Sequence, residues 1–264
     1  MEKPAKSIAV HSFKGGTGKS TITANTSVAL ALDNKRVCVM DMDLEGPGLH
    51  VIFNIDPAEV KYTLNDVLRG SASPEMAAIS MNHRLGLSKG EIYFCPASSR
   101  VDEMLKTLRT GFEVDSFSTA IARLKEHFKL DYLLIDTHPG IENDTLLAMG
   151  VCDHLLIVSR LDQQDIFGTG VIIELARVLE KPAHLALNMV PKGIKDSQIT
   201  LLAKKIAANL NTELLTWLPF SDDVLGSLSK SVFILSMPKN PMSERFTKVA
   251  RAFEAFDQKR GKVD

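Results

Sequence analysis

A glycine-rich stretch at residues 13–20, which reads FKGGTGKS, limits what this chain can fold into more than any other feature. It follows an apolar run at residues 8–10 and precedes a helix-like run at residues 21–32. A strand that leads through a glycine-rich loop into a helix is the setting of a phosphate-binding loop. The glycines let backbone N–H groups turn toward a polyphosphate, and the helix N-terminus adds positive potential. The stretch therefore predicts a nucleotide phosphate site.

The residues of this loop have different expected roles. Lys19 is expected to reach the β- and γ-phosphates, and the Ser20 hydroxyl is expected to hold Mg²⁺. The pattern G-x-x-x-x-G-K-[ST] fails at one position, because Phe13 replaces the first glycine and Lys14 follows it. The other residues expected to contact the nucleotide are Gly15, Gly16, Thr17, Gly18 and Thr21. The alternative interpretation is a strand–helix turn with an incidental lysine, and Lys14 would then be an ordinary solvated side chain.

Short apolar runs alternate with longer helical patterns along nearly the whole chain. We expect strands at residues 7–13, 36–41, 92–95, 132–136, 154–159, 184–189 and 214–218. We expect helices at residues 19–32, 101–109, 116–128, 165–179, 195–209 and 241–256. Continuous apolar strands suit a parallel sheet with helices on both faces. The expected fold is therefore α/β, with a single doubly wound, mostly parallel sheet. No linker divides residues 1–264, so we expect one domain with its core at about 6–256 and a short polar tail at 257–264.

Acidic residues follow two of the expected strands. Ligands in such sheets bind beyond the carboxyl ends of the strands, where Asp41, Asp43 and Asp136 would lie. Asp136 is expected to hold Mg²⁺ directly or through water. Asp43 is expected to orient an attacking water and to belong to the metal site, while Asp41 would lie nearer the metal shell. The alternative for these residues is turn formation or helix capping. Gly140 would let its loop swing toward a γ-phosphate.

Composition indicates the class of protein and its expected location in the cell. The 264 residues are 45% hydrophobic and 24% charged, which fits a globular protein with a sizeable core. The net charge of −1 makes no overall case for nucleic acid or an anionic membrane. Three isolated cysteines suggest neither a disulfide framework nor a metal knuckle, and we expect Cys38 and Cys152 to be buried. Without a signal peptide or an apolar run of about 18 residues, the expected location is the cytoplasm, with a peripheral place at a membrane or nucleoid as the alternative.

The last expected helix, at residues 241–256, carries an apolar stripe with basic residues elsewhere on its surface. Such a helix can lie on a membrane, but a terminal helix that covers its own domain has the same pattern. We expect the second arrangement. The polar residues 257–264 that follow are too few and too charged for a convincing anchor.

The motifs taken together resemble those of the MinD/ParA-type ATPases, the deviant Walker A proteins of the SIMIBI class. The resemblance is strongest to MinD-like proteins. It rests on residues 14–20, 41–47, 95–98, 134–142, 187–188 and 218–219, which occur in the family's order. It therefore covers about residues 6–256.

The resemblance implies an Mg²⁺-dependent ATPase that works as a nucleotide-sandwich homodimer. Lys14 would reach the partner's phosphates, while Lys19 serves the phosphates of its own subunit. Asn188 and Pro219 would lie at the adenine, where the Asn188 amide can both donate and accept. Loop capping is the alternative for Asn188. The family's activity is a switch, stimulated by a protein partner and working on a membrane surface or DNA, that positions or partitions a cargo or a division site.

Two other functions on the same fold stay open. One is a metabolic enzyme that transfers a phosphoryl group to a small substrate, although Lys14 would have no part in such chemistry. The other is a factor that matures metal centres. Relatives of that kind carry paired cysteines, which this chain lacks, although Cys95 could supply one ligand per subunit across a dimer axis. His138 stands where many relatives have a small residue or proline, so it either tunes its loop or is a partly exposed turn residue.

Overall fold

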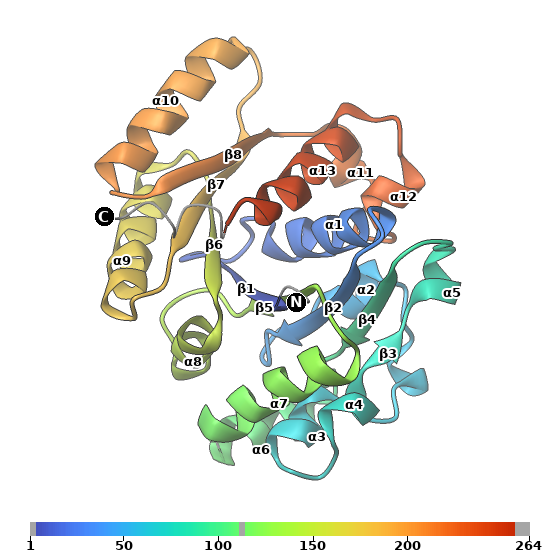
Figure 1. Cartoon of the computed structure of the whole chain (residues 1–264). Helices are drawn as coiled ribbons and strands as arrows, with labels where there is room; N and C mark the ends of the chain where they lie inside the picture. The colour runs from blue at the N-terminus through green and yellow to red at the C-terminus, as the bar shows by residue number, and fades with distance from the viewer. Residues whose placement is uncertain (1–3, 111–113, 257–264) are drawn as a thin grey trace.

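The computed structural model describes residues 4–110 and 114–256. Within these residues an eight-stranded sheet has the order β3-β4-β2-β5-β1-β6-β7-β8 (Figure 1). The strands are β1 (Lys6–His11), β2 (Arg36–Met42), β3 (Ile79–Ser80), β4 (Glu91–Cys95), β5 (Tyr132–Thr137), β6 (His154–Ser159), β7 (Ala183–Val190) and β8 (Glu213–Pro219). Neighbouring strands are parallel except for β3, which pairs with β4 in the antiparallel direction. The expected fold class is confirmed.

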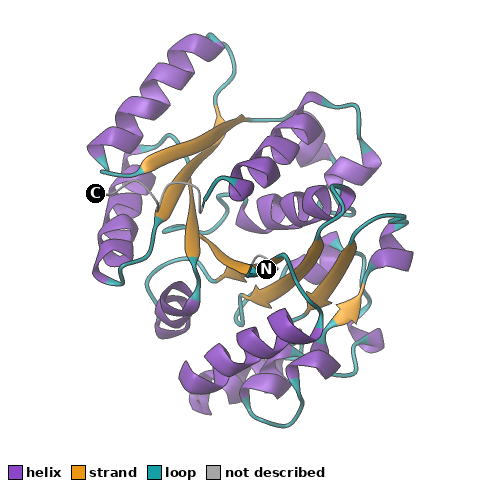
Figure 2. Cartoon of the chain, viewed as in Figure 1, coloured by secondary structure: helices purple, strands orange, loops and turns teal. Residues whose placement is uncertain are grey.

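Helices cover both faces of this sheet, as Figure 2 shows by the purple ribbons around the orange strands. The longer helices are α1 (Lys19–Leu32), α6 (Val101–Thr110), α7 (Val114–His127), α8 (Asn143–Val151), α9 (Gln163–Val178), α10 (Asp196–Asn209) and α13 (Pro241–Glu254). The shorter ones are α2 (Leu49–Ile52), η1 (Pro57–Glu59), α3 (Leu64–Leu68), α4 (Pro74–Ala77), α5 (Asn82–Leu85), α11 (Asp222–Gly226) and α12 (Phe233–Ser236).

The two faces of the sheet build separate apolar cores, because successive side chains of a strand point to opposite sides. Ile8 and Val10 of β1 belong to a core with helices α1, α12 and α13. Ala9, between them, belongs to a second core with helices α7, α8 and α9. Each of these strand residues is fully buried. The continuous apolar strand pattern therefore reflects burial on both faces.

The expected strands and helices are all present; β6 and α1 have the expected bounds, and the other elements have shifted ends. The first strand ends at His11 because Ser12 and Phe13 already belong to the turn that leads into the loop. The sequence interpretation missed β3, which has only two residues, and helix α8, whose nine residues lie between closely spaced strands. It also missed the short helices α2, η1, α3, α4, α5, α11 and α12.

The last helix, α13, packs against the sheet and α1, as expected. Its apolar stripe is buried within the first core, with Phe246 at 2% and Phe253 at 0% exposure. The polar tail at residues 257–264 lies outside the described residues. No helix in the described ranges combines the length and apolar character needed to cross a membrane.

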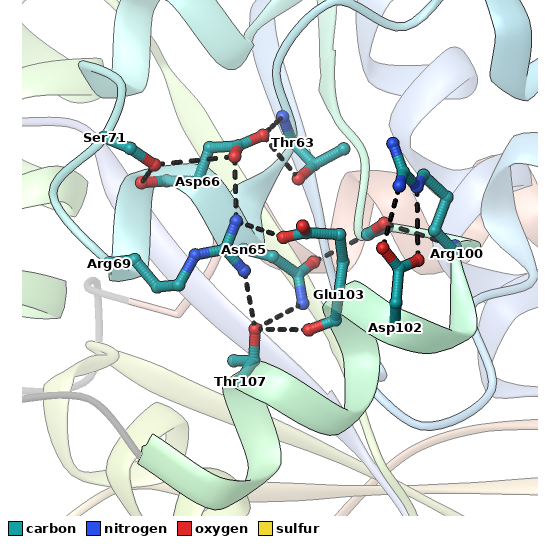
Figure 3. A network of polar contacts seen from close by, with 10 residues as sticks. Thr63, Asn65, Asp66, Arg69, Ser71, Arg100, Asp102, Glu103 and Thr107 are labelled. Carbon is teal, nitrogen blue, oxygen red and sulfur yellow. Dashed lines mark hydrogen bonds and ion pairs between the residues drawn. The ribbon is translucent and has the colours of Figure 1, made fainter.

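A polar network ties α3 to α6 and to the segment after β4 (Figure 3). Asn65 accepts a hydrogen bond from the Ser98 backbone N–H at 2.7 Å and donates one to the Thr107 hydroxyl at 3.0 Å. Arg69 donates to Thr107 at 3.2 Å and to Asp66 at 2.9 Å. Because Asn65 and Thr107 are buried, these bonds satisfy groups that would otherwise be costly to bury. The Cys-Pro-Ala-Ser motif at residues 95–98 thus contributes to the framework of the fold.

Candidate nucleotide site

The glycine-rich loop lies between β1 and α1, at the carboxyl edge of the sheet's centre. Gly18 precedes α1 with a left-handed backbone (φ 91°), and a Cβ there would overlap Asn188 Nδ2. The same Nδ2 donates a hydrogen bond to the Thr17 carbonyl at 2.7 Å. Position 18 requires glycine for two reasons: the backbone has a positive φ, and the Asn188 amide nitrogen occupies the space that a Cβ would need. The loop is therefore fastened to the end of β7 by Asn188.

Phe13, which replaces the first glycine of the usual pattern, packs against α9. Its ring contacts Gly168 so closely that a Cβ at position 168 would overlap the ring. Phe13 belongs to the second apolar core as a partly buried member. Phe13, at the position of the missing glycine, thus packs the start of the loop against α9.

The structure brings Lys19, Ser20 and Asp136 together, as the sequence predicts. Lys19 is 7% exposed at the first position of α1, and Asp136 is 1% exposed at the end of β5. Burial raises the pKa of Asp136 to about 6, while the positive charge of Lys19 and a hydrogen bond from Ser20 oppose that rise. Thr23, one turn further along α1, donates to Asp136 at 3.4 Å.

The two aspartates after β2 have different surroundings. Asp41 is 1% exposed, and its carboxylate accepts the backbone N–H groups of Asp43 at 3.2 Å and Leu49 at 3.3 Å. Burial, and then the nearby charge of Asp136, raise the pKa of Asp41 well above its usual range. Asp43 accepts the Gly46 N–H at 2.9 Å and is close enough to raise the pKa of Asp136 further. Both therefore shape the loop, as the turn interpretation predicts, and the charge of Asp43 also acts on the Asp136 carboxyl group.

His138 lies in the loop after β5 and faces the loop after β2. Its Nε2 is 3.4 Å from a Glu45 carboxylate oxygen, and its side chain is 22% exposed. It is therefore a partly exposed turn residue whose side chain connects the two loops that carry Asp43 and Gly140.

The Lys14 side chain contacts the start of α9. Its ammonium donates to the Gln164 side-chain oxygen at 2.6 Å and lies 3.5 Å from an Asp162 carboxylate oxygen. Both partners belong to the start of α9 in the same chain, and the Lys14 side chain is 25% exposed. The structure does not bring Lys14 to the Lys19, Ser20 and Asp136 cluster. Gly15 beside it is exposed, and a Cβ at that position would meet Pro139 Cγ at an ordinary contact distance of 3.8 Å.

A cavity of about 480 Å³ adjoins the loop on the side of β7 and β8. Of the residues expected at the nucleotide, it is lined by Gly16, Gly18, Thr21, Asn188 and Pro219. Its remaining wall is largely apolar and was not foreseen: Ile22, Met189, Phe220, Ser221, Val224, Leu225, Leu228, Ser229, Met242 and Phe246. The apolar spacing at residues 224, 225 and 228, directly after the last strand, is the signal that could have identified it.

Asn188 combines a contact to the loop with a place in the wall of the cavity. The sequence suggests that its amide both donates to and accepts from a base. One of the two Nδ2 hydrogens goes to the Thr17 carbonyl at 2.7 Å, as the loop-capping interpretation expects. An amide also has a second Nδ2 hydrogen and the Oδ1 acceptor, so this contact is compatible with a base in the adjoining cavity.

The residues present fit a magnesium nucleotide. The Thr17 hydroxyl is buried and has no hydrogen-bond partner within the described part of the chain. A Cβ at Gly16 would meet no atom within 4 Å, so the loop has open space on its ligand side. Hydroxyl and carboxylate oxygens, as on Ser20 and Asp136, are the ligands Mg²⁺ prefers. The loop thus offers the Thr17 hydroxyl and open space for phosphates, and the oxygens of Ser20 and Asp136 could bind Mg²⁺.

His11, which the sequence interpretation did not single out, is fully buried at the end of β1. The Thr137 hydroxyl donates to the Val10 carbonyl at 3.1 Å, so His11 Nδ1, at 2.7 Å from that hydroxyl, is the donor between them. Burial, and then the charge of Lys19, lower the pKa of His11 to about 3. His11 is therefore buried in its neutral form.

We expect His11 to make folding stability depend on pH. Its ordinary pKa of 6.5 is lowered to about 3 in the fold, so between these values the unfolded chain binds a proton that the folded chain does not. Stability falls as the pH drops through 6.5, by about 2 kcal/mol from pH 7 to pH 5. Denaturant unfolding of the wild type and of His11→Asn at both pH values measures this. The raised pKa of Asp136 acts with the opposite sign, but it is common to both proteins.

The difference between the two proteins therefore isolates His11. Wild type is expected to lose about 2 kcal/mol more than His11→Asn on acidification. Equal losses in the two proteins would contradict the buried neutral state of His11.

A mostly parallel sheet with a phosphate loop after its central strand and a carboxylate at the end of the next strand defines a P-loop NTPase. The chain belongs to the ParA family, whose model, described as NUBPL iron-transfer P-loop NTPase, matches residues 3–254. The resemblance seen in the sequence is thereby confirmed.

Individual relatives agree with this family. The chain is 27% identical over 248 residues to the septum site-determining protein MinD of Bacillus subtilis, across 93% of this chain and 88% of that protein. It is 26% identical over 274 residues to the cytosolic Fe-S cluster assembly factor NUBP1 homolog of Caenorhabditis briggsae, across 94% and 80%. Its fold is similar to that of MinD complexed with Mg-ADP from Pyrococcus horikoshii, with a TM-score of 0.80, 23% identity, and coverage of 98% and 100%.

Proposed function

We propose that this chain is an ATP-dependent dimerisation switch. Mg-ATP binding joins two copies of a single-domain subunit spanning residues 1–264, and hydrolysis separates them. The observation that carries this proposal is the different setting of the two loop lysines. Lys19 is buried beside Asp136, where it serves the phosphates of its own subunit. Lys14 is partly exposed at the rim of the loop, where a second subunit's phosphates would approach.

Exposed apolar side chains near this rim also favour a second copy. Phe167 is 74% exposed on α9, one turn beyond Gln164, and Ile141 is 40% exposed directly after Gly140. Large apolar groups exposed beside a functional site commonly mark a contact surface. A paired subunit facing the loop would cover both of them.

The proposed chemistry assigns one task to each residue. Loop N–H groups and Lys19 hold the phosphates, and Asn188 and Pro219 border the adenine. Bound Mg²⁺, held by Ser20 and Asp136, would neutralise charge on the phosphates. Asp43 orients the attacking water, and the partner's copy of Lys14 adds positive charge where negative charge develops during phosphoryl transfer.

Light scattering tests the switch directly. In an Asp43→Ala variant hydrolysis is blocked, so the ATP state should accumulate. We expect its mass to double with Mg-ATP and to stay that of one subunit with Mg-ADP. The matched control is the double variant Lys19→Ala and Asp43→Ala, which should not bind ATP and should stay a monomer. A monomeric mass for Asp43→Ala at saturating ATP would contradict the proposal.

The biological use we propose is positioning or partitioning of a cargo or division site, with hydrolysis stimulated by a protein partner at a membrane or DNA surface. The likeness to the Bacillus subtilis septum site-determining protein supports this use. The location would be cytoplasmic, with peripheral attachment. ATPase rates with liposomes, with DNA and with neither would distinguish the two surfaces.

Iron–sulfur transfer is the second candidate, and the family description and the NUBP1 homolog favour it. The suggestion that Cys95 supplies a ligand is not supported, because Cys95 is fully buried. Burial, and then the nearby Asp41, raise the pKa of the Cys95 thiol to about 12, which disfavours the thiolate that a metal needs. Iron and sulfide analysis after anaerobic reconstitution would support this candidate if a bound cluster were found.

A further inference from the structure

We propose that His11 and Thr137 form a buried polar clasp that positions Asp136, and the loop that follows it, for ATP hydrolysis. His11 is a positioning residue in this arrangement, because it acts through the Thr137 hydroxyl. The inference rests on the hydrolysis step of the proposed function and adds a residue to it.

The clasp lies where two neighbouring strands end. β1 and β5 are parallel, and their last registered pair is Val10 and Asp136. His11 and Thr137 follow this pair and are the final residues of the two strands. His11 Nδ1 donates to the Thr137 hydroxyl at 2.7 Å, and that hydroxyl donates to the Val10 carbonyl at 3.1 Å. Side-chain bonds thus extend the pairing of the strands by one residue, directly after Asp136.

The clasp lies just before the loop that carries Gly140. Beyond it, the Gly140 N–H donates to the Ser12 carbonyl at 3.0 Å. In the proposed switch this loop turns toward a γ-phosphate, which requires the bond from Gly140 to Ser12 to break. The contact between His11 and Thr137 does not involve Gly140. It can therefore hold Asp136 in place while the loop changes position.

His11 has an energetic cost that packing does not explain. Its side chain is fully buried, and its Nε2 has no hydrogen-bond partner in the described part of the chain. A buried polar atom without a partner destabilises a fold, and an apolar side chain of similar size would avoid that cost. Such atoms are rare, and a functional role is one explanation for them. The role we assign to His11 is the Nδ1 bond to Thr137.

The His11 ring can hold Thr137 without adding charge to the site. Burial, and then the positive charge of Lys19, lower the pKa of His11 to about 3. At neutral pH the ring therefore stays uncharged and does not repel Lys19.

Substitutions on both sides of the clasp test the inference by turnover. His11→Leu and Thr137→Val each remove the bond, and each should lower kcat by about three- to tenfold, while the KM for Mg-ATP changes by less than about twofold. His11→Asn should recover most of the rate, because its Nδ2 is bonded to Cγ, as Nδ1 is, and can donate to Thr137. The double variant His11→Leu and Thr137→Val should lose no more than either single variant.

Thr26→Val is the matched control. Thr26 is also fully buried, but within the described ranges its hydroxyl has no hydrogen-bond partner. The control removes a buried hydroxyl without touching the clasp, so it should keep the wild-type kcat.

A second measurement does not depend on turnover. NMR of the histidine ring nitrogens in the nucleotide-free protein reports which nitrogen carries the proton, and the loss of a signal in His11→Asn identifies His11. We expect Nδ1 of His11 to be protonated and Nε2 to be bare. The Nδ1 proton should exchange with solvent faster in Thr137→Val. A ring protonated at Nε2 alone in the wild type would overturn the inference.

The kinetic outcomes separate this inference from the proposed function. Wild-type rates in His11→Leu and Thr137→Val overturn the inference alone. An equal loss of rate in Thr26→Val, or a His11→Asn variant as slow as His11→Leu, also overturns it. If the wild type hydrolyses no ATP, the proposed function fails and the inference fails with it.

Discussion

Replacing Lys14 with alanine is expected to reduce ATP hydrolysis by about a thousandfold or more, which is the effect of removing a cation supplied in trans in phosphoryl transfer. Nucleotide binding by the single subunit should change little, because Lys14 contacts Gln164 and Asp162 and not the Lys19 and Asp136 cluster. Turnover assays and titration with a fluorescent ATP analogue measure the two properties separately.

Lys19→Ala is the matched control for this prediction, since it changes the other lysine of the same loop. It should lose nucleotide binding itself, because Lys19 is buried at the start of α1 beside Asp136. If Lys14→Ala weakens binding by the isolated subunit as severely as Lys19→Ala does, the assignment of Lys14 to a partner's phosphates is wrong. Retained hydrolysis in Lys14→Ala would also contradict it.

Gly168→Ala is expected to destabilise the fold by about 1–3 kcal/mol, as overpacking in a filled core does. In most helix interiors this change would instead stabilise by about 0.5–1 kcal/mol, because glycine loses more backbone entropy on folding. Here the added Cβ would overlap Cγ and Cδ1 of Phe13, and the ring can move away only by rotation about χ1, against the core on which it packs. Steric overlap therefore makes Gly168→Ala destabilising, although the entropy term alone would make it stabilising. Denaturant unfolding measures the change in free energy.

Gly150→Ala in α8 is the control, because a Cβ there would meet no atom within 4 Å. It should be neutral or stabilising. The double variant Phe13→Ala and Gly168→Ala should lose less stability than the two single losses added together, by about 1 kcal/mol or more. Additive losses would show that the Phe13 ring and position 168 do not constrain one another.

The local part of the site could be predicted from the chain. Continuous apolar runs mark the strands because each is buried on both faces of the sheet. Lys19 and Ser20 follow from the loop pattern, and Asp136 from its place at a strand end, because parallel strands bring their carboxyl ends to one edge. The fold prediction succeeded, and the structure brings these three side chains together, because each depends on one short segment and on the general geometry of parallel sheets.

The sequence by itself thus determined a parallel α/β sheet, a phosphate loop after its first strand and an acidic edge beside that loop. Only the tertiary structure decided how distant segments use the same residues. It assigned the Asn188 donor to the Thr17 carbonyl, the Phe13 ring to Gly168 and the Lys14 ammonium to the start of α9. The physical reason is that spacing along the chain specifies local backbone geometry, whereas contacts between distant segments depend on which side chains the packing of strands and helices brings within reach.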